Sequence, residues 1–300
     1  MMKFTQSFAL AGCFALFSAA QTHAQRDFSD VEITVSTVAD GVYMLRGAGG
    51  NMGLSVGDDG SFLIDDQFAP LSDRIIAAIK TVSDDPVEFV LNTHWHGDHT
   101  GGNEAFGEAG AHVLAHENVR KRLKAGLTRT GGAVTPPAQP GALPTITFSK
   151  DISFYWNDHD IHIWHPDPAH TDGDAIVMLR GANVVHMGDI FFNGTYPFID
   201  IESGGDLDGY IAAVEMVLAK INDETKIIPG HGPLAGKADL ENSLAMLQHV
   251  RARVQALIDE SASADEAVAA DPLKDLNPIW GQGFINGERM VRAAHASLSK

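Results

Sequence analysis

The sequence is poor in cysteine and in positive charge, and each shortage excludes a class of protein. Cys13 is the only cysteine among 300 residues, so no disulfide framework within the chain is possible. Only 21 residues are lysine or arginine against 39 acidic ones, which gives a formal net charge of −18. This charge argues against nucleic acid or an anionic membrane surface as the main partner. A small anionic substrate is still compatible, because a bound metal ion can dominate the field in its own pocket.

Long apolar runs are also missing, apart from one near the N-terminus. Phe8–Ala20 is apolar but too short to span a bilayer, and it lies between Lys3 and a plausible cleavage site at Thr22-His23-Ala24. We therefore expect a signal peptide at residues 1–24 and a periplasmic or secreted protein with no integral membrane segment after cleavage. The alternative is a lipoprotein acylated in the run Leu10–Cys13. The chain stays apolar after this run, which favours the soluble form.

Residues 25–300 alternate short apolar runs with segments of helical periodicity, and no linker interrupts them, so we expect one domain. The predicted strands are Val31–Val38, Val42–Arg46, Met52–Val56, Ser61–Asp65, Val87–Asn92, Ala111–Ala115, Ile152–Trp156, Asp160–His165, Ala175–Arg180, Asn183–His186 and Lys226–Ile228. The predicted helices are Ser72–Val82, Glu117–Lys124, Leu207–Ile221, Ala238–Glu260 and Met290–Leu298. Residues 125–147 are rich in Gly, Pro and Thr and show no clear periodicity, which is typical of a functional loop.

The segment with the clearest chemistry contains His94, His96, Asp98 and His99, between an apolar strand and two glycines. A loop at a strand end can aim alternate side chains in one direction, so His94 and His96 can reach one metal ion together. Asp98 and His99 can then face a second position beside it. Nitrogen-rich ligation suits zinc, and a catalytic zinc leaves one coordination position for water. A solvated turn is the competing interpretation, but four coordinating groups this close together argue against it.

One turn of sequence cannot close a site for two metal ions, so further ligands must come from distant segments. The candidates are His170, Asp189 and His231, each on a connection next to a short apolar run. A single histidine beside glycines is more often a surface-turn residue. The order and setting of the three candidates together favour ligation.

These seven residues resemble the metal-binding motifs of the metallo-β-lactamase superfamily, with His-x-His-x-Asp-His intact at residues 94–99. The resemblance covers nearly all of the chain after the signal peptide. It implies an α/β fold, a four-layer αββα sandwich with two mixed sheets packed together and the metals at one edge. It also implies two zinc ions per chain. In this assignment His94, His96 and His170 bind the first zinc, Asp98, His99 and His231 bind the second, and Asp189 bridges both.

Such a centre implies a hydrolase. Two zinc ions lower the pKa of a shared water, so that a metal-bridging hydroxide can cleave a small amide- or ester-type substrate near neutral pH. Asp98 is the expected catalytic residue, because it can orient the nucleophile and relay a proton. The partner is thus a small molecule, and the sequence does not determine the oligomeric state.

Three further residues are weaker candidates. Asp65 ends an apolar strand and can support a ligand histidine from behind, although a strand-terminating turn with Asp66 accounts for it equally well. Asn193 and Tyr196 follow Asp189 closely and are predicted to line the substrate pocket. We interpret the other nearby histidines and one tryptophan as packing or surface residues: Trp95, His159, His162, His165 and His186.

The substrate is open between two classes of hydrolase. The chain is similar to exported zinc β-lactamases, which predicts β-lactam hydrolysis, as the main or as a secondary activity. Asp189 stands where those enzymes carry a cysteine, His99 where they lack a ligand, and Phe192 where they carry a lysine that binds the drug's carboxylate. The Asp189 and His99 pattern instead resembles glyoxalase II (a thioesterase), lactonases and phosphodiesterases. An iron-dependent redox protein and a non-catalytic zinc-binding protein are the remaining alternatives.

Overall fold

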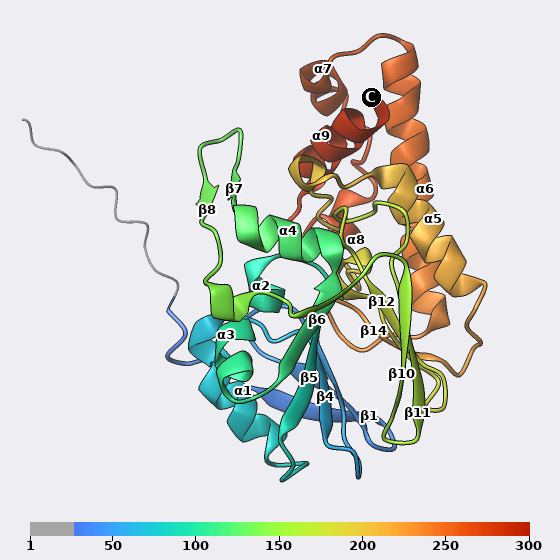
Figure 1. The fold of residues 1–300 in the computed structure, drawn as a ribbon. Helices are drawn as coiled ribbons and strands as arrows, with labels where there is room; N and C mark the ends of the chain where they lie inside the picture. Colours follow the sequence, from blue (N-terminus) through green and yellow to red (C-terminus); the bar gives the residue numbers. More distant parts are fainter. Residues whose placement is uncertain (1–26) are drawn as a thin grey trace, which may run out of the picture.

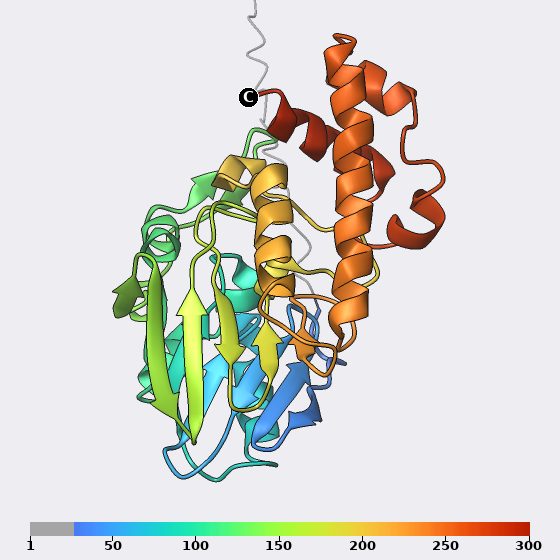
Figure 2. The same ribbon diagram turned by 90° about the vertical axis from the view of Figure 1, so that its right-hand side faces the viewer.

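Two mixed β-sheets pack face to face, with helices on both outer sides (Figure 1, Figure 2). The computed structural model describes residues 27–300, so the predicted signal peptide and Cys13 lie outside the described residues. Within that range the layers run helix, sheet, sheet, helix. The predicted αββα sandwich is therefore confirmed.

The first sheet is antiparallel at its N-terminal end and parallel from β4 onward. Among the described residues it has seven strands in the order β1-β2-β3-β4-β5-β6-β9. Their bounds are Thr34–Ala39 (β1), Val42–Arg46 (β2), Met52–Ser55 (β3), Ser61–Ile64 (β4), Val87–Asn92 (β5), His112–His116 (β6) and Ile146–Phe148 (β9).

The second sheet has five strands within the same range, in sequence order β10 to β14. Their bounds are Asp151–Trp156 (β10), His159–Trp164 (β11), Ile176–Leu179 (β12), Val184–His186 (β13) and Lys226–Ile228 (β14). Neighbours are antiparallel except β13 and β14, which are parallel. As a result β11, β13 and β14 all point the same way, and their carboxyl ends meet at one edge of the sheet.

Strict alternation along the strands builds the layers, because successive side chains of a strand point to opposite faces. Phe62 and Ile64 of β4 face the second sheet, while Leu63 between them faces the outer helices. In β12, Val177 faces the first sheet and Ile176 packs outward under the C-terminal helices. Most of the predicted strands are short apolar runs because both of their faces are buried.

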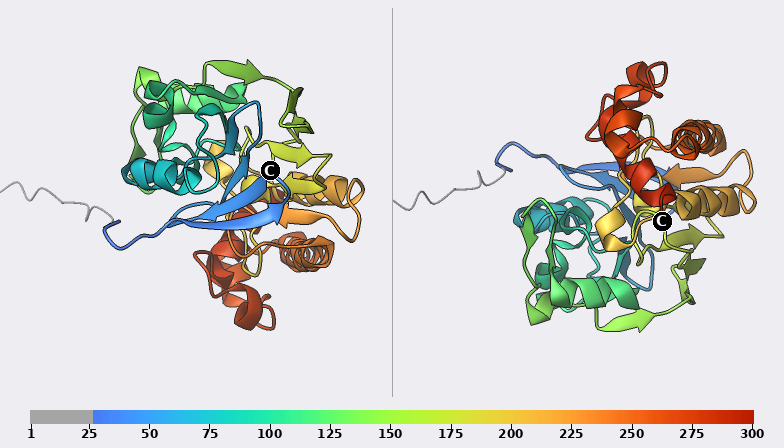
Figure 3. Two further views of the ribbon diagram at one scale, coloured as in Figure 1. Left: turned by 90° about the horizontal axis from the view of Figure 1, so that it is seen from below. Right: turned by 90° about the horizontal axis from the view of Figure 1, so that it is seen from above.

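The outer helices divide between the two sheets, as the views from below and above show (Figure 3). The teal and green helices on the first side are α1 (Ser72–Ile79), α2 (Gly97–Thr100), α3 (Asn103–Glu108) and α4 (Glu117–Ala125). The second side carries α5 (Leu207–Leu218), α6 (Lys237–Asp259), α7 (Ala264–Ala269), α8 (Asn277–Trp280) and α9 (Gly287–Leu298). No helix among the described residues combines the length and the apolarity needed to cross a bilayer.

The structure departs from the sequence prediction mainly in short elements. Residues 125–147 were expected to be irregular, but they contain a hairpin of β7 (Leu127–Thr128) and β8 (Val134–Thr135), a turn of 3₁₀ helix at Pro140–Ala142, and the first two residues of β9. The hairpin projects beyond the sandwich at the upper left of Figure 1. Helices α3, α7 and α8 were not predicted, because four to six residues are too few to show a helical period.

The packed interface between the sheets gives a stability prediction. Replacing Ile163, which is fully buried there, with alanine should lower the free energy of unfolding by about 2–5 kcal/mol, because the lost methylenes leave a cavity. Tyr155→Ala is the control, since that side chain is 81% exposed on β10 and should change stability by no more than about 0.5 kcal/mol. Urea unfolding followed by circular dichroism measures both. Equal effects of the two substitutions would contradict the two-sheet core.

Candidate metal centre

The carboxyl ends of four strands from both sheets meet at one edge and carry all seven predicted ligands. Two of the ligands follow β5, two lie on α2, and one each follows β11, β13 and β14. They form two adjoining groups: His94, His96, His170 and Asp189 in the first, and Asp98, His99 and His231 in the second. Within each group the candidate ligand atoms lie within 4.8 Å of one another. The structure thus brings together residues up to 137 positions apart in the chain, from 94 to 231.

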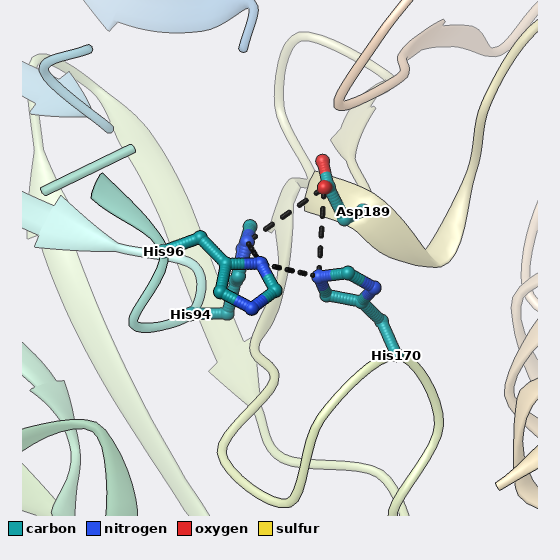
Figure 4. Close-up of side chains that lie close together, drawn as sticks. All are labelled: His94, His96, His170 and Asp189. Carbon is teal, nitrogen blue, oxygen red and sulfur yellow. Dashed lines mark hydrogen bonds and ion pairs between the residues drawn. The ribbon is translucent and has the colours of Figure 1, made fainter. Parts of the chain in front are cut away.

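In the first group the ring nitrogens of three histidines converge (Figure 4). His96 Nδ1 lies 3.1 Å from His94 Nε2 and 2.9 Å from His170 Nε2. Asp189 Oδ2 completes the group, 3.7 Å from His94 Nε2 and 3.5 Å from His170 Nε2. Three nitrogens and one oxygen around a common point are a donor set that suits zinc.

The other oxygen of Asp189 faces the second group. Asp189 Oδ1 lies 3.1 Å from His99 Nε2 and 3.4 Å from His231 Nε2. Asp98 Oδ2 approaches the same two rings, 3.8 Å from His99 Nε2 and 3.5 Å from His231 Nε2. One oxygen of Asp189 towards each group is the arrangement that a bridging ligand needs.

Three of the histidines are held from behind by a hydrogen bond at their outer ring nitrogen. His99 Nδ1 donates to Asp65 Oδ2 at 2.7 Å, and His170 Nδ1 donates to the carbonyl oxygen of Phe198 at 2.7 Å. His96 Nε2 donates to Asp200 Oδ2 at 2.8 Å. Carboxylates and carbonyls only accept, so the proton is on the outer nitrogen and the inner nitrogen keeps its lone pair for a metal.

Asp65 joins the end of β4 to the loop that carries the first histidines. It is fully buried and has a φ of 62°, the left-handed region that a non-glycine residue rarely adopts. Its two carboxylate oxygens accept from the backbone N–H and the hydroxyl of Thr93, each at 2.7 Å, in addition to His99. The backbone strain is therefore offset by three hydrogen bonds that fix both His99 and the residue before His94.

Two buried polar atoms show that the residues fit a cation. His99 Nε2 and Asp189 Oδ1 are buried and lie 3.1 Å apart, yet neither forms a hydrogen bond with any described residue. Both face the second group of ligand atoms, so a divalent cation there would satisfy them. Burial also lowers the pKa of His94 well below its usual value and that of His170 to about 4, so both rings are neutral and can ligate.

Asp200 is a site residue that the sequence did not reveal. It is 1% exposed, and besides His96 it accepts from Arg129 Nη1 and Nη2, each at 2.8 Å, and from Ser203 Oγ at 2.7 Å. Burial opposes its charge, but the hydrogen bonds from Arg129 and His96 hold the pKa of Asp200 well below its usual range. Through Arg129, which follows β7, this carboxylate ties the β7–β8 hairpin to a candidate metal ligand.

Four of the seven candidate ligands line a cavity of about 520 Å³. Its lining consists of Ala48, Phe68, His96, Asp98, Arg129, Asp189, Phe192, Thr195, Phe198, His231 and Phe284. The sequence had given no reason to place four of these residues in the cavity: Phe68, Arg129, Phe198 and Phe284. Residues 125–147 had been expected to be functional, and Arg129 belongs to them.

The prediction that Asn193 and Tyr196 line this pocket is wrong. Asn193 turns away and donates through Nδ2 to the carbonyl oxygen of Pro233 at 3.1 Å. Tyr196 is buried in the apolar core that the second sheet forms with α5, α6 and α9 (the second core), where its hydroxyl donates to Asn277 Oδ1 at 3.2 Å. Thr195 lines the cavity in their place, because the chain after Asp189 turns so that this residue faces the metal centre.

The histidines interpreted as packing residues lie outside the two groups of candidate ligands. His186 is buried, and its Nε2 donates to the carbonyl oxygen of Asn51 at 3.2 Å. Burial lowers the pKa of His186 to about 4. Trp95 packs in a small cluster with Val119 and Leu123 of α4, so it supports the loop between two candidate ligands.

Comparison with known proteins gives one family for this chain. The model of the metallo-beta-lactamase superfamily matches residues 45–231, more than half of the chain, and the match contains all seven candidate ligands. A solved metallo-beta-lactamase from Pontibacter korlensis superposes with a TM-score of 0.60 at 20% sequence identity, over 72% of this chain and 99% of that one. At this identity the superposition supports the fold alone.

Two curated relatives carry the names of different hydrolases. A hydroxyacylglutathione hydrolase of Polaromonas sp. strain JS666 is 30% identical over 166 residues, which is 54% of this chain and 55% of that protein. A metallo-beta-lactamase type 2 of Bacillus sp. strain 170 is 23% identical over 178 residues, which is 59% of this chain and 64% of that protein. The chain thus spans about 55–64% of the length of these relatives.

The hydrogen bond from His96 to Asp200 generates a prediction about metal affinity. Asp200→Asn removes the charge that fixes the proton on His96 Nε2, so zinc affinity should fall about 10–100-fold, as for other residues that orient a ligand from behind. Competition with a colorimetric chelator measures this dissociation constant. Asp208→Asn is the matched control, because Arg251 binds Asp208 in the same bidentate way and neither residue forms a hydrogen bond with a candidate ligand. Equal zinc affinity in both variants would show that Asp200 does not position His96.

Proposed function

Because this chain belongs to the metallo-beta-lactamase superfamily, we propose that it is a metal-dependent hydrolase that holds two zinc ions and cleaves a small ester- or amide-type substrate. The observation that carries the proposal is the convergence of seven ligand side chains in two adjoining groups, with one carboxylate oxygen of Asp189 facing each group. The centre opens into a cavity of about 520 Å³, which suits a small molecule.

The zinc ions, when bound, supply a hydroxide nucleophile at neutral pH and polarise the substrate's oxygen. Asp98 is 27% exposed in its side chain and lines the cavity, so its carboxylate can orient the attacking water and accept its proton. The carbonyl oxygen of Asp98 accepts from the Gly50 N–H at 3.1 Å, which fixes the backbone at this residue. A side chain at Gly50 would overlap the His99 ring, so glycine is needed for this close approach.

Esters, thioesters, lactones or phosphodiesters fit the cavity better than β-lactam drugs do. Phe192 stands where the resemblance to zinc β-lactamases places a carboxylate-binding lysine, and its ring stacks on His231 at 4.8 Å. A drug carboxylate would lose a charge-assisted hydrogen bond worth about 1.5–3 kcal/mol. Hydrolysis of β-lactams is therefore proposed as a secondary activity. The signal-like residues 1–24 support a place of action in the periplasm or outside the cell.

Turnover by the zinc-loaded mature protein tests the proposal. It should hydrolyse 4-nitrophenyl acetate or another ester in a panel with a lactone, bis(4-nitrophenyl) phosphate and a chromogenic cephalosporin, the cephalosporin most slowly. Dialysis against a chelator should abolish every activity, and added zinc should restore it. Asp98→Asn should lower kcat about 10²–10⁴-fold, because the general base is lost. Metal analysis by mass spectrometry should give two zinc ions per chain.

Three results would contradict parts of this proposal. Full activity of Asp98→Asn would show that the base is misassigned, and Asp223→Asn serves as the control because that carboxylate is 85% exposed and remote from the cavity. Tight zinc binding without turnover of any ester, lactone, phosphodiester or β-lactam would favour a zinc-binding protein. One iron per chain from the native host would favour the redox alternative.

A further inference from the structure

The walls of the metal cavity are aromatic. Besides the ligands, four phenylalanines line it: Phe68, Phe192, Phe198 and Phe284. Phe198 stacks on the ring of His96 with centroids 5.8 Å apart, and it meets Phe284 edge to face at 6.1 Å. Rings on several sides of a cavity create a surface that gains free energy when an apolar group replaces water against it.

Phe284 comes from a part of the chain beyond the family match, which ends at residue 231. It is 73% exposed, unusually high for a phenylalanine, yet it is held at both ends. The Arg289 guanidinium lies over its ring at 5.1 Å, and Arg289 Nη1 donates to the carbonyl oxygen of Phe284 at 3.0 Å. The next residue, Ile285, is buried in the second core and anchors the segment from the other side. An exposed ring fixed in this way is preorganised for contact.

The C-terminal segment that carries Phe284, residues 277–286, is tied to the loop that follows Asp189. The backbone N–H of Tyr196 donates to the carbonyl oxygen of Trp280 at 2.8 Å, and its hydroxyl donates to Asn277 Oδ1. A side chain at Gly283 would press against Thr195, so the segment packs directly on a residue that lines the cavity. Tyr196 therefore links this segment to the loop that lines the metal cavity.

The cavity offers no unpaired lysine or arginine to an anionic group. Among the described residues that line it, Arg129 is the one such side chain. Both of its Nη atoms donate to Asp200, and Nη1 also lies 3.2 Å from Glu202 Oε2. A charged group buried against the phenylalanines would lose its hydration without gaining a partner, which is strongly unfavourable.

We propose that this aromatic wall, with Phe284 as its outer side, selects substrates whose acid moiety is an uncharged apolar chain or ring of several carbons. This inference rests on the proposed hydrolase function and names the substrate class of the same site. The C-terminal segment thus takes part in specificity without contributing a metal ligand.

Three esters measured on the zinc-loaded protein test the preference: 4-nitrophenyl acetate, 4-nitrophenyl hexanoate and mono-4-nitrophenyl adipate, which has a charged end. We expect kcat/KM for the hexanoate to exceed both others by about tenfold or more, since each buried methylene contributes roughly a factor of four. Phe284→Ala should reduce the hexanoate-to-acetate ratio about fivefold, and Phe284→Leu should restore most of it. Ile279→Ala is the matched control, because Ile279 is 67% exposed on the same C-terminal segment but does not line the cavity.

Binding of free hexanoate and adipate, followed by calorimetry on the same variants, separates the two proposals. A hexanoate affinity that exceeds the adipate affinity and falls in Phe284→Ala supports the apolar wall even if no ester is hydrolysed, in which case only the hydrolase function fails. Hydrolysis of all three esters at similar rates, unchanged by Phe284→Ala, overturns the wall and leaves the hydrolase intact. Without turnover, equal binding of the two acids overturns it as well.

Discussion

The buried carboxylate of Asp189 joins the two sheets at the edge that carries the candidate ligands. Its oxygens face His99 and His94 from the first sheet and His170 and His231 from the second. Its own backbone is fixed by the hydroxyl of Tyr210, which donates to the Asp189 carbonyl oxygen at 2.9 Å. A buried carboxylate is stable only beside positive charge. The two sheets can therefore pack around Asp189 at this edge only if a cation or protonated histidines lie next to it.

Rigid support around the ligands follows from the same constraint. Asp65, Asp200 and the carbonyl oxygen of Phe198 each fix the proton on the outer nitrogen of one ring, so the inner lone pairs point at a common space. Two of these acceptors lie on the loop after β13, and Arg129 reaches one of them from the β7–β8 hairpin. The pocket walls and the ligand geometry therefore share hydrogen bonds and cannot be altered independently at these residues.

Short apolar runs predicted most of the individual strands. The four layers and the convergence of the seven residues were predicted because the spaced motifs resemble those of a known superfamily, since no short-range pattern relates residues this far apart in the chain. The pairing of Arg129 with Asp200 could not be predicted from local sequence, because 71 residues separate the two. Tyr196 was placed in the pocket and Phe284 was not identified for a related reason: which of several neighbouring side chains faces a cavity depends on the turn of an irregular loop, and no period reveals that turn.

The position of Phe284 on the C-terminal segment has an evolutionary consequence. This segment is held in place through Tyr196, Asn277 and Ile285, none of which is a candidate metal ligand. Substitution of this exposed ring therefore changes the shape of the cavity without exposing the core or altering the candidate metal ligands. After gene duplication, single-nucleotide changes at residue 284 can therefore change which substrates the cavity accepts. The sheet edge that carries the candidate ligands is inherited unchanged.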